Sequence, residues 1–164
     1  MHPEQLEHGK EFPHVKKDRG YFGIGIFHSE NEENVGTLWR SAYAFGASFI
    51  FTIDAKYKKQ STDVVNAWTS IPLYHYKDFD DFYSHLPYDC RLIAVEMDEK
   101  AGSIIDFEHP HRCVYLLGCE SIGLGKKIIE RCHGTISLPG CHSLNVAVAG
   151  SIVMYDRSAK RGEV

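Results

Sequence analysis

Short apolar runs alternate with amphipathic stretches from Tyr21 to Lys160. The apolar runs have the length of buried strands and predict strands at residues 21–27, 47–53, 71–76, 91–95, 113–117 and 135–138. Helical periodicity between these runs predicts helices near residues 32–45, 78–85, 126–132 and 143–160. Because strands separated by helices need crossover connections, we expect an α/β fold with a mostly parallel sheet flanked by helices.

Residues 1–20 lack this pattern and mix basic with acidic side chains. Such a composition is typical of a mobile or docking arm. We find no linker or internal repeat in the remaining sequence. We therefore expect an N-terminal arm over residues 1–20 and one domain over residues 21–164.

The two longest predicted helices differ in their polar surface. In the helix at 32–45, Asn31 suits the N-cap, and Arg40 lies nearly opposite the apolar stripe, so it is either a solvated surface residue or a functional one. The last helix is apolar around much of its circumference. A helix of that kind must be covered by the core, by a partner subunit, or by both.

The composition is that of an ordinary globular domain. The chain has 164 residues, of which 43% are hydrophobic and 24% charged, and its formal net charge is -4. This balance gives no global attraction for phosphate backbones or anionic membranes, although local basic clusters occur. Those clusters are Lys56, Lys58 and Lys59; Lys126, Lys127 and Arg131; and Arg157, Lys160 and Arg161.

The spacing of the cysteines and histidines indicates a protein of a reducing compartment that holds no metal. The five cysteines form no CxxC pair, and no segment has the apolar length of a signal peptide or a membrane span, so we expect a cytoplasmic protein with no membrane partner. Among ten histidines, the close pair His109 and His111 lacks a second pair at zinc-ligand spacing. We interpret these two as solvated loop histidines and expect no metal.

The glycine-rich turns do not fit the familiar phosphate-binding templates. A phosphate loop needs Lys directly after its second glycine and then Ser or Thr, but Leu124 follows Gly123, and Lys127 follows Lys126. The pair Gly23 and Gly25 lies inside an apolar run and lacks the third glycine of a dinucleotide site. Serine hydrolase and zinc protease patterns do not occur either.

Three strand-to-helix junctions carry more polar and small residues than a structural loop needs. They are NEENVGTLWR, LLGCESIGL and CHSLNV. Their notable residues are Asn34, Gly36, Arg40, Gly118, Glu120, Gly123, Ser143, Leu144 and Asn145.

These segments resemble the three motifs of the SpoU/TrmH family of RNA ribose 2′-O-methyltransferases. The family motifs read approximately Asn-x-Gly-x-x-x-Arg, Gly-x-Glu-x-x-Gly-Leu and Ser-Leu-Asn-Val, and all three occur here in the family order. The resemblance covers residues 21–160. The third motif is closer to the TrmH-like branch than to the enzymes of the tRNA wobble position.

The resemblance implies a C-terminal trefoil knot and S-adenosylmethionine as the cofactor, held largely by backbone groups in the knotted loops. By position, the cofactor-binding residues are Leu117, Gly118, Leu138 and Leu144. Small residues permit close backbone approach, and apolar side chains can sandwich an adenine. The loop at residues 140–142 is shorter than in many relatives, which could alter the pocket floor.

The implied reaction is methyl transfer to a ribose 2′-hydroxyl. Arg40 matches the family arginine that acts on this hydroxyl, and because arginine stays protonated, orienting the hydroxyl is its safer role. Asn34 and Glu120 match residues that position this arginine. Ser143 and Asn145 match the pair at the start of the last helix, where they can cap the helix and face the site.

The resemblance also implies a homodimer that binds RNA across both subunits, with tRNA favoured over rRNA as the substrate. Two alternatives stay open. One is a module that binds adenosylmethionine and RNA but has lost catalysis. The other is a flavodoxin-like nucleotide-binding domain unrelated to methylation.

Overall fold

A computed structural model describes residues 20–55 and 70–162 of the chain. The elements in chain order are β1 (Tyr21–Phe27), α1 (Glu32–Phe45), β2 (Phe49–Ile53), β3 (Leu73–Tyr76), α3 (Phe79–Ser84), β4 (Arg91–Val95), β5 (Gly102–Ser103), the 3-10 helix η2 (Ile104–Asp106), β6 (Arg112–Gly118), α4 (Lys126–Arg131), β7 (Gly134–Ser137) and α5 (Val146–Lys160). The expected arm at 1–20 and the cluster Lys56, Lys58 and Lys59 lie outside the described residues, Gly20 excepted.

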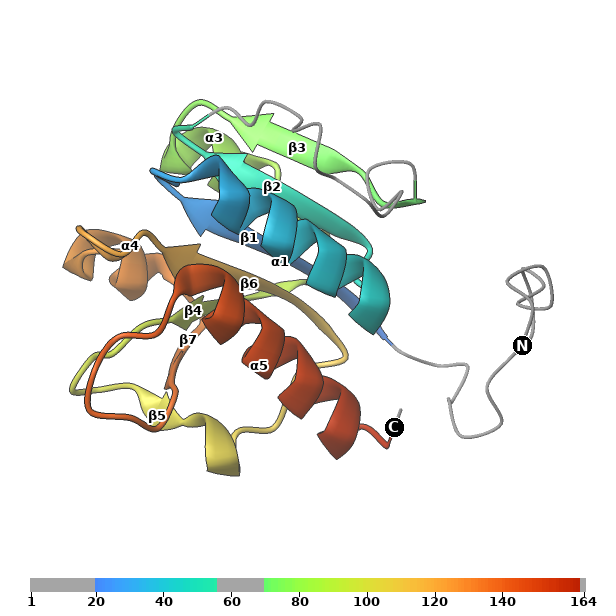
Figure 1. Ribbon diagram of the computed structural model, residues 1–164, viewed down its shortest axis with the longest axis vertical. Helices are drawn as coiled ribbons and strands as arrows, with labels where there is room; N and C mark the ends of the chain where they lie inside the picture. The colour runs from blue at the N-terminus through green and yellow to red at the C-terminus, as the bar shows by residue number, and fades with distance from the viewer. Residues whose placement is uncertain (1–19, 56–69, 163–164) are drawn as a thin grey trace, which may run out of the picture.

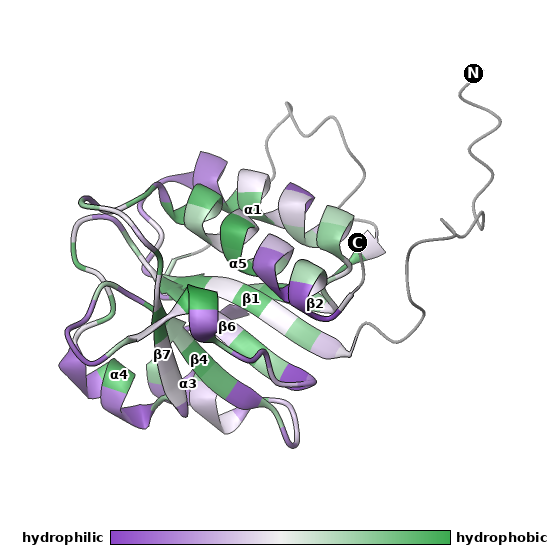
Figure 2. Cartoon of the chain, turned by 90° about the horizontal axis from the view of Figure 1, so that it is seen from below, coloured by the Kyte–Doolittle hydropathy of each residue, from purple (hydrophilic) through white to green (hydrophobic). Residues whose placement is uncertain are grey.

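The strands form a seven-stranded parallel sheet in the order β3-β2-β1-β6-β4-β7-β5 (Figure 1). This confirms the predicted α/β class and the mostly parallel sheet. The sheet lies between two layers of helices, with α1 and α5 on one face and α3 and α4 on the other (Figures 1 and 2). Each layer buries its own apolar cluster against the sheet.

Helix α1 is bounded by the residues that the sequence indicates. The Asn31 side chain accepts a hydrogen bond from the Glu33 N–H at 2.8 Å, and Gly46 ends the helix in the left-handed conformation with φ +77°. The carboxylates of Glu32 and Glu33 occupy the first turn, where they face the positive end of the helix dipole. The predicted bounds of this helix are therefore confirmed.

Helices α1 and α5 pack closely because α5 carries a glycine at their contact. A Cβ on Gly150 would lie 2.5 Å from Leu38 Cδ1, and the Ser151 hydroxyl donates to the Ser41 hydroxyl at 2.8 Å. The first turns of both helices are thereby held at the carboxyl edge of the sheet. No helix of the described segments is long and apolar enough to cross a membrane.

The prediction that His109 is a solvated loop residue is wrong. Its ring is fully buried, with Nδ1 2.6 Å from Tyr115 Oη and Nε2 2.7 Å from Asp156 Oδ2. Burial lowers the pKa of His109 below its ordinary value, although Asp156 opposes this effect. No group of three or more His, Cys, Asp or Glu within residues 20–55 and 70–162 is arranged to hold a metal ion.

The burial of His109 predicts a pH dependence of stability. Because burial lowers the pKa of His109 in the folded chain, the unfolded chain takes up a proton on this residue at a higher pH than the folded chain does. The free energy of unfolding is therefore highest above about pH 6.5 and falls as the pH drops below that value. Urea unfolding between pH 5 and 8 should show this decline, with a slope of at most about 1.4 kcal/mol per pH unit from this residue. His109→Gln should flatten the slope, whereas His142→Gln, at an exposed position, should not. Equal slopes in all three proteins would contradict the prediction.

Candidate functional site

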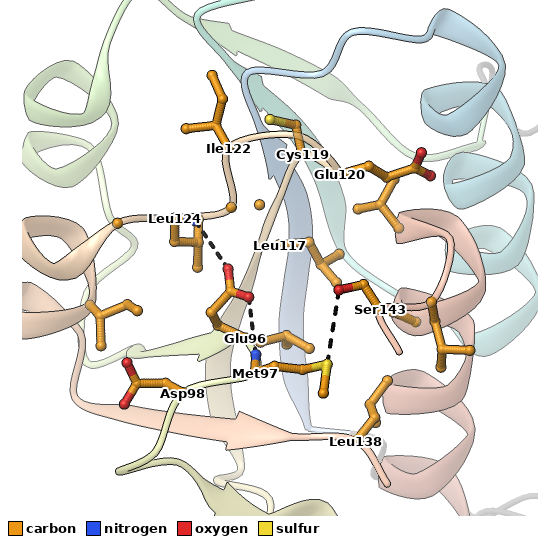
Figure 3. Close-up of a pocket in the computed structure, with 18 of the residues that line it drawn as sticks. Glu96, Met97, Asp98, Leu117, Cys119, Glu120, Ile122, Leu124, Leu138 and Ser143 are labelled. Atoms are coloured by element: carbon orange, nitrogen blue, oxygen red, sulfur yellow. Dashed lines mark hydrogen bonds between the residues drawn. The ribbon is translucent and has the colours of Figure 1, made fainter. Parts of the chain in front are cut away.

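A cavity of about 390 Å³ lies at the carboxyl edge of the sheet. It is lined by residues 95–98 at the end of β4, by residues 117–126 from the end of β6 to the start of α4, and by residues 138–139 and 142–144 between β7 and α5 (Figure 3). These loops meet because the strands are parallel and adjacent, so their carboxyl ends reach the same edge. Its size is within the range of small-molecule sites, about 300–1,000 Å³.

The loop after β6 is folded tightly on itself by two glycines. The Gly123 N–H donates to the Cys119 carbonyl at 3.0 Å, and Gly123 has φ +66°, a conformation that favours glycine. A Cβ on Gly118 would lie 2.5 Å from the carbonyl carbon of Gly123. Gly118 is thus required by the packing of this loop against its own backbone.

Glu96, directly after β4, connects this loop to the rest of the cavity. Its Oε2 accepts from the Leu124 N–H at 3.0 Å, and its Oε1 accepts from the Met97 N–H at 3.0 Å (Figure 3). Sequence reasoning missed this residue. A charged side chain immediately after a buried strand was the available indication, because such positions lie at the carboxyl edge.

Asn145 joins the three sequence motifs. Its side-chain NH2 donates to Asn34 Oδ1 at 2.9 Å and to Glu120 Oε1 at 3.1 Å, while its Oδ1 accepts from the N–H groups of Ala147 and Val148. Both amide hydrogens and the carbonyl oxygen of Asn145 are therefore satisfied. The predicted site residues Asn34, Glu120 and Asn145 come from segments far apart in the chain and meet beside the cavity.

Arg40 is exposed on the outer side of α1, opposite the buried stripe, and does not line the cavity. Among the described residues it forms no hydrogen bond or ion pair, and Glu120 bonds Asn145 instead. The expected pairing of Glu120 with Arg40 is thus not found within the chain. Glu120 is joined through Asn145 to Asn34, and Arg40, six residues further along α1, points in a different direction from Asn34.

The structure places the remaining predicted site residues as follows. Ser143 precedes α5 without capping it, because the helix begins at Val146; its hydroxyl donates to Met97 Sδ at 3.9 Å. Leu144 is exposed at the cavity wall, and Leu138 is half-buried against the core. Leu117 is buried at the cavity base.

Much of the basic charge is used internally. Arg157 is fully buried and donates to the carbonyls of Pro110 and His111, so it is not available to a ligand. Lys160 donates to the carbonyl of Phe107, and Arg131 pairs with Asp80. The cavity lining itself holds three carboxylates, Glu96, Asp98 and Glu120, and one lysine, Lys126.

Known proteins resemble this chain in sequence and in fold. Residues 22–155 match the model of the SpoU rRNA Methylase family. The fold is similar to that of a protein studied for the 2-OH methylation of C/U34 on tRNA, with 23% identity, a TM-score of 0.74, and coverage of 87% of this chain and 97% of that one.

Two further solved structures share the fold. The SpoU methyltransferase AviRb from Streptomyces viridochromogenes, in complex with AdoMet, has 20% identity and a TM-score of 0.76 over 93% of this chain and 62% of its own. The A. aeolicus TrmH/SpoU tRNA modifying enzyme has 18% identity and a TM-score of 0.76 over 90% of this chain and 77% of its own. No curated protein matches the sequence.

Proposed function

Because the chain belongs to the SpoU rRNA Methylase family, we propose that it transfers a methyl group from S-adenosylmethionine to a ribose 2′-hydroxyl of RNA. The observation that carries this proposal is the convergence of Asn34, Glu120 and Asn145 beside a cavity of about 390 Å³. A binding loop that merely held a nucleotide would not need these three polar side chains tied together. The flavodoxin-like alternative is therefore set aside.

The cavity suits the proposed cofactor in size and charge. Backbone groups of residues 117–124 would hold it, and the side chains of Leu138 and Leu144 would flank its adenine. When bound, S-adenosylmethionine supplies an electrophilic methyl group on a positively charged sulfonium. Carboxylates in the lining, Glu96 and Asp98 among them, favour such a cation over a neutral ligand.

The reaction requires a 2′-hydroxyl aligned with the methyl carbon. In our proposal Arg40 orients this hydroxyl and its neighbouring phosphate, since a guanidinium donates in a fixed fork and stays protonated. As the 2′-oxygen takes up the methyl group, the hydroxyl proton would pass to water or to the neighbouring RNA phosphate, because the protonated guanidinium of Arg40 cannot accept it. Asn145, through its hydrogen bonds to Asn34 and Glu120, would hold the start of α1 beside the cavity where this occurs. Ser143 would shape the opposite wall through its contact with Met97.

We propose that the active form is a homodimer assembled on α5. The exposed side of this helix carries Val148, Ile152 and Tyr155, which are 39–58% exposed and spaced to form one stripe. Pairing two copies would cover this stripe and complete the surface on which RNA lies. Sedimentation should give about twice the chain mass of 18.6 kDa, and a monomer at micromolar concentration would contradict the dimer.

We further propose tRNA as the substrate, with rRNA as the alternative. Incubation of the chain with S-adenosylmethionine labelled in its methyl group, and with separate tRNA and rRNA pools, tests both. Nucleoside analysis should recover the label as 2′-O-methylribose from tRNA. Label in a base would contradict the reaction, and cofactor binding without transfer to either pool would favour the catalytically inactive module.

Two parts of the resemblance stay proposals about this chain. One is that the C-terminal segment forms a trefoil knot, supported by the contact of Asn145, just before α5, with Glu120 in the loop after β6. An experimental structure traced through both segments would test it. The other is a cytoplasmic location, supported by five free cysteines. Fractionation of the source cells would test that location.

A further inference from the structure

Glu96 forms hydrogen bonds to two of the segments that build the cavity and to strand β7. Its own backbone N–H donates to the Ile136 carbonyl on β7 at 3.0 Å, which fixes the residue at the end of the sheet. From there the side chain accepts one hydrogen bond from Met97 and another from Leu124. Met97 Sδ in turn accepts from the Ser143 hydroxyl, so the connection extends to the segment before α5 (Figure 3).

The turn at Gly123 and Leu124 is shaped around this carboxylate. A Cβ on Gly123 would lie 2.7 Å from Glu96 Oε2, so the carboxylate fills the space that any other residue at 123 would need. The Leu124 side chain is buried in the apolar cluster between the sheet and helices α3 and α4, which anchors the other side of the turn. Glu96 therefore determines where the backbone of residues 123–124 lies relative to β4.

We propose that Glu96 is a positioning residue for the cofactor: its carboxylate holds the Gly123–Leu124 backbone in the form that makes one wall of the cavity. The inference rests on the proposed function and deepens it, because none of the three sequence motifs contains this residue. Hydrogen bonds to a charged acceptor are about twice as strong as neutral ones. Loss of the Glu96 charge therefore weakens the hydrogen bonds that hold this wall of the cavity, even when no cofactor is bound.

Glu96→Gln tests this role with little change in side-chain size. The amide keeps one acceptor oxygen, so only one of the two backbone N–H groups keeps its partner, and the other faces an NH2 group. We expect the Kd for S-adenosylmethionine, measured by calorimetry without RNA, to rise about tenfold or more. We expect kcat at saturating cofactor to stay within about twofold, because the methyl-transfer geometry is restored once the cofactor is bound.

Glu99→Gln is the matched control, since Glu99 is exposed, three residues away and outside the cavity lining. Both variants remove one negative charge, so an effect of net charge alone would raise both Kd values alike. Asp98→Asn removes another carboxylate of the cavity lining, one without a partner in the Gly123–Leu124 backbone, and it should raise the Kd less than Glu96→Gln does. Equal cofactor affinity of Glu96→Gln and the wild type would overturn the inference. So would a loss in Glu99→Gln or Asp98→Asn equal to that in Glu96→Gln.

Failure of the proposed function gives a different result. If the wild type binds no S-adenosylmethionine, that function is wrong, and the positioning role is then decided by hydrogen exchange of the Leu124 amide. Its protection should fall at least tenfold in Glu96→Gln and stay unchanged in Glu99→Gln. Unchanged protection in Glu96→Gln would overturn the positioning role on its own.

Discussion

Replacing Arg40 by alanine should lower kcat for RNA methylation by about a hundredfold or more, the usual effect of removing a group that orients the reacting hydroxyl or stabilises charge in the transition state. Because Arg40 is exposed and forms no hydrogen bond or ion pair with the described residues, its removal should leave the melting temperature unchanged. Single-turnover label transfer to RNA measures the rate, and thermal unfolding measures stability. The affinity for S-adenosylmethionine should also stay the same, since Arg40 does not line the cavity.

Two further variants sharpen this experiment. Arg40→Lys keeps the charge but loses the planar fork, so it should recover only a small part of the rate if the arginine orients both hydroxyl and phosphate. Arg91→Ala removes another exposed arginine, at the first residue of β4 and hence at the opposite edge of the sheet, and should retain full activity. A fully active Arg40→Ala protein would refute the assignment. So would an equal loss in both alanine variants.

The sequence predicted the fold well wherever local patterns decide the structure. Strands β1 and β4 and helix α1 have the predicted bounds, because apolar runs, the cap at Asn31 and the glycine at 46 each mark a boundary. The start of α5 was predicted three residues too early. Leu144 continues the apolar pattern, but the Asn145 side chain itself caps the helix and so ends the loop. The pair Gly102–Ser103 is too short for any periodicity, and β5 was missed.

The sequence predicted only those residues of the candidate site that its three motifs contain. Asn34, Glu120 and Asn145 were named from the sequence, and the structure brings them together. The outward direction of Arg40 followed from helical phase, whereas its separation from Glu120 required coordinates. Arg157 looked like surface charge, because nothing local reveals that the carbonyls of Pro110 and His111 converge on a buried guanidinium. Such contacts depend on residues more than 40 positions away.

The second large effect is expected at Gly118. In Gly118→Ala the added methyl group would lie 2.5 Å from the backbone of Gly123, so the loop after β6 must move outward. Overpacking of this kind costs about 1–3 kcal/mol. If the displaced loop has to return to its place when the cofactor binds, that energy weakens binding of S-adenosylmethionine by roughly 5- to 150-fold. Calorimetry on the folded variant measures this change directly.

The matched control is Gly102→Ala in β5, where the new Cβ makes only an ordinary contact at 3.9 Å and the site lies outside the cavity lining. That variant should bind the cofactor as the wild type does. Gly118→Ala should also lose methyl transfer at low cofactor concentration and regain it at high concentration, because binding of the cofactor returns the loop to its place and Arg40 on α1 is unchanged. If affinity stayed normal, the glycine would be needed only for folding, and the loop after β6 would not be the wall that holds the cofactor. A loss of rate at saturating cofactor would instead indicate that this loop also contacts the RNA.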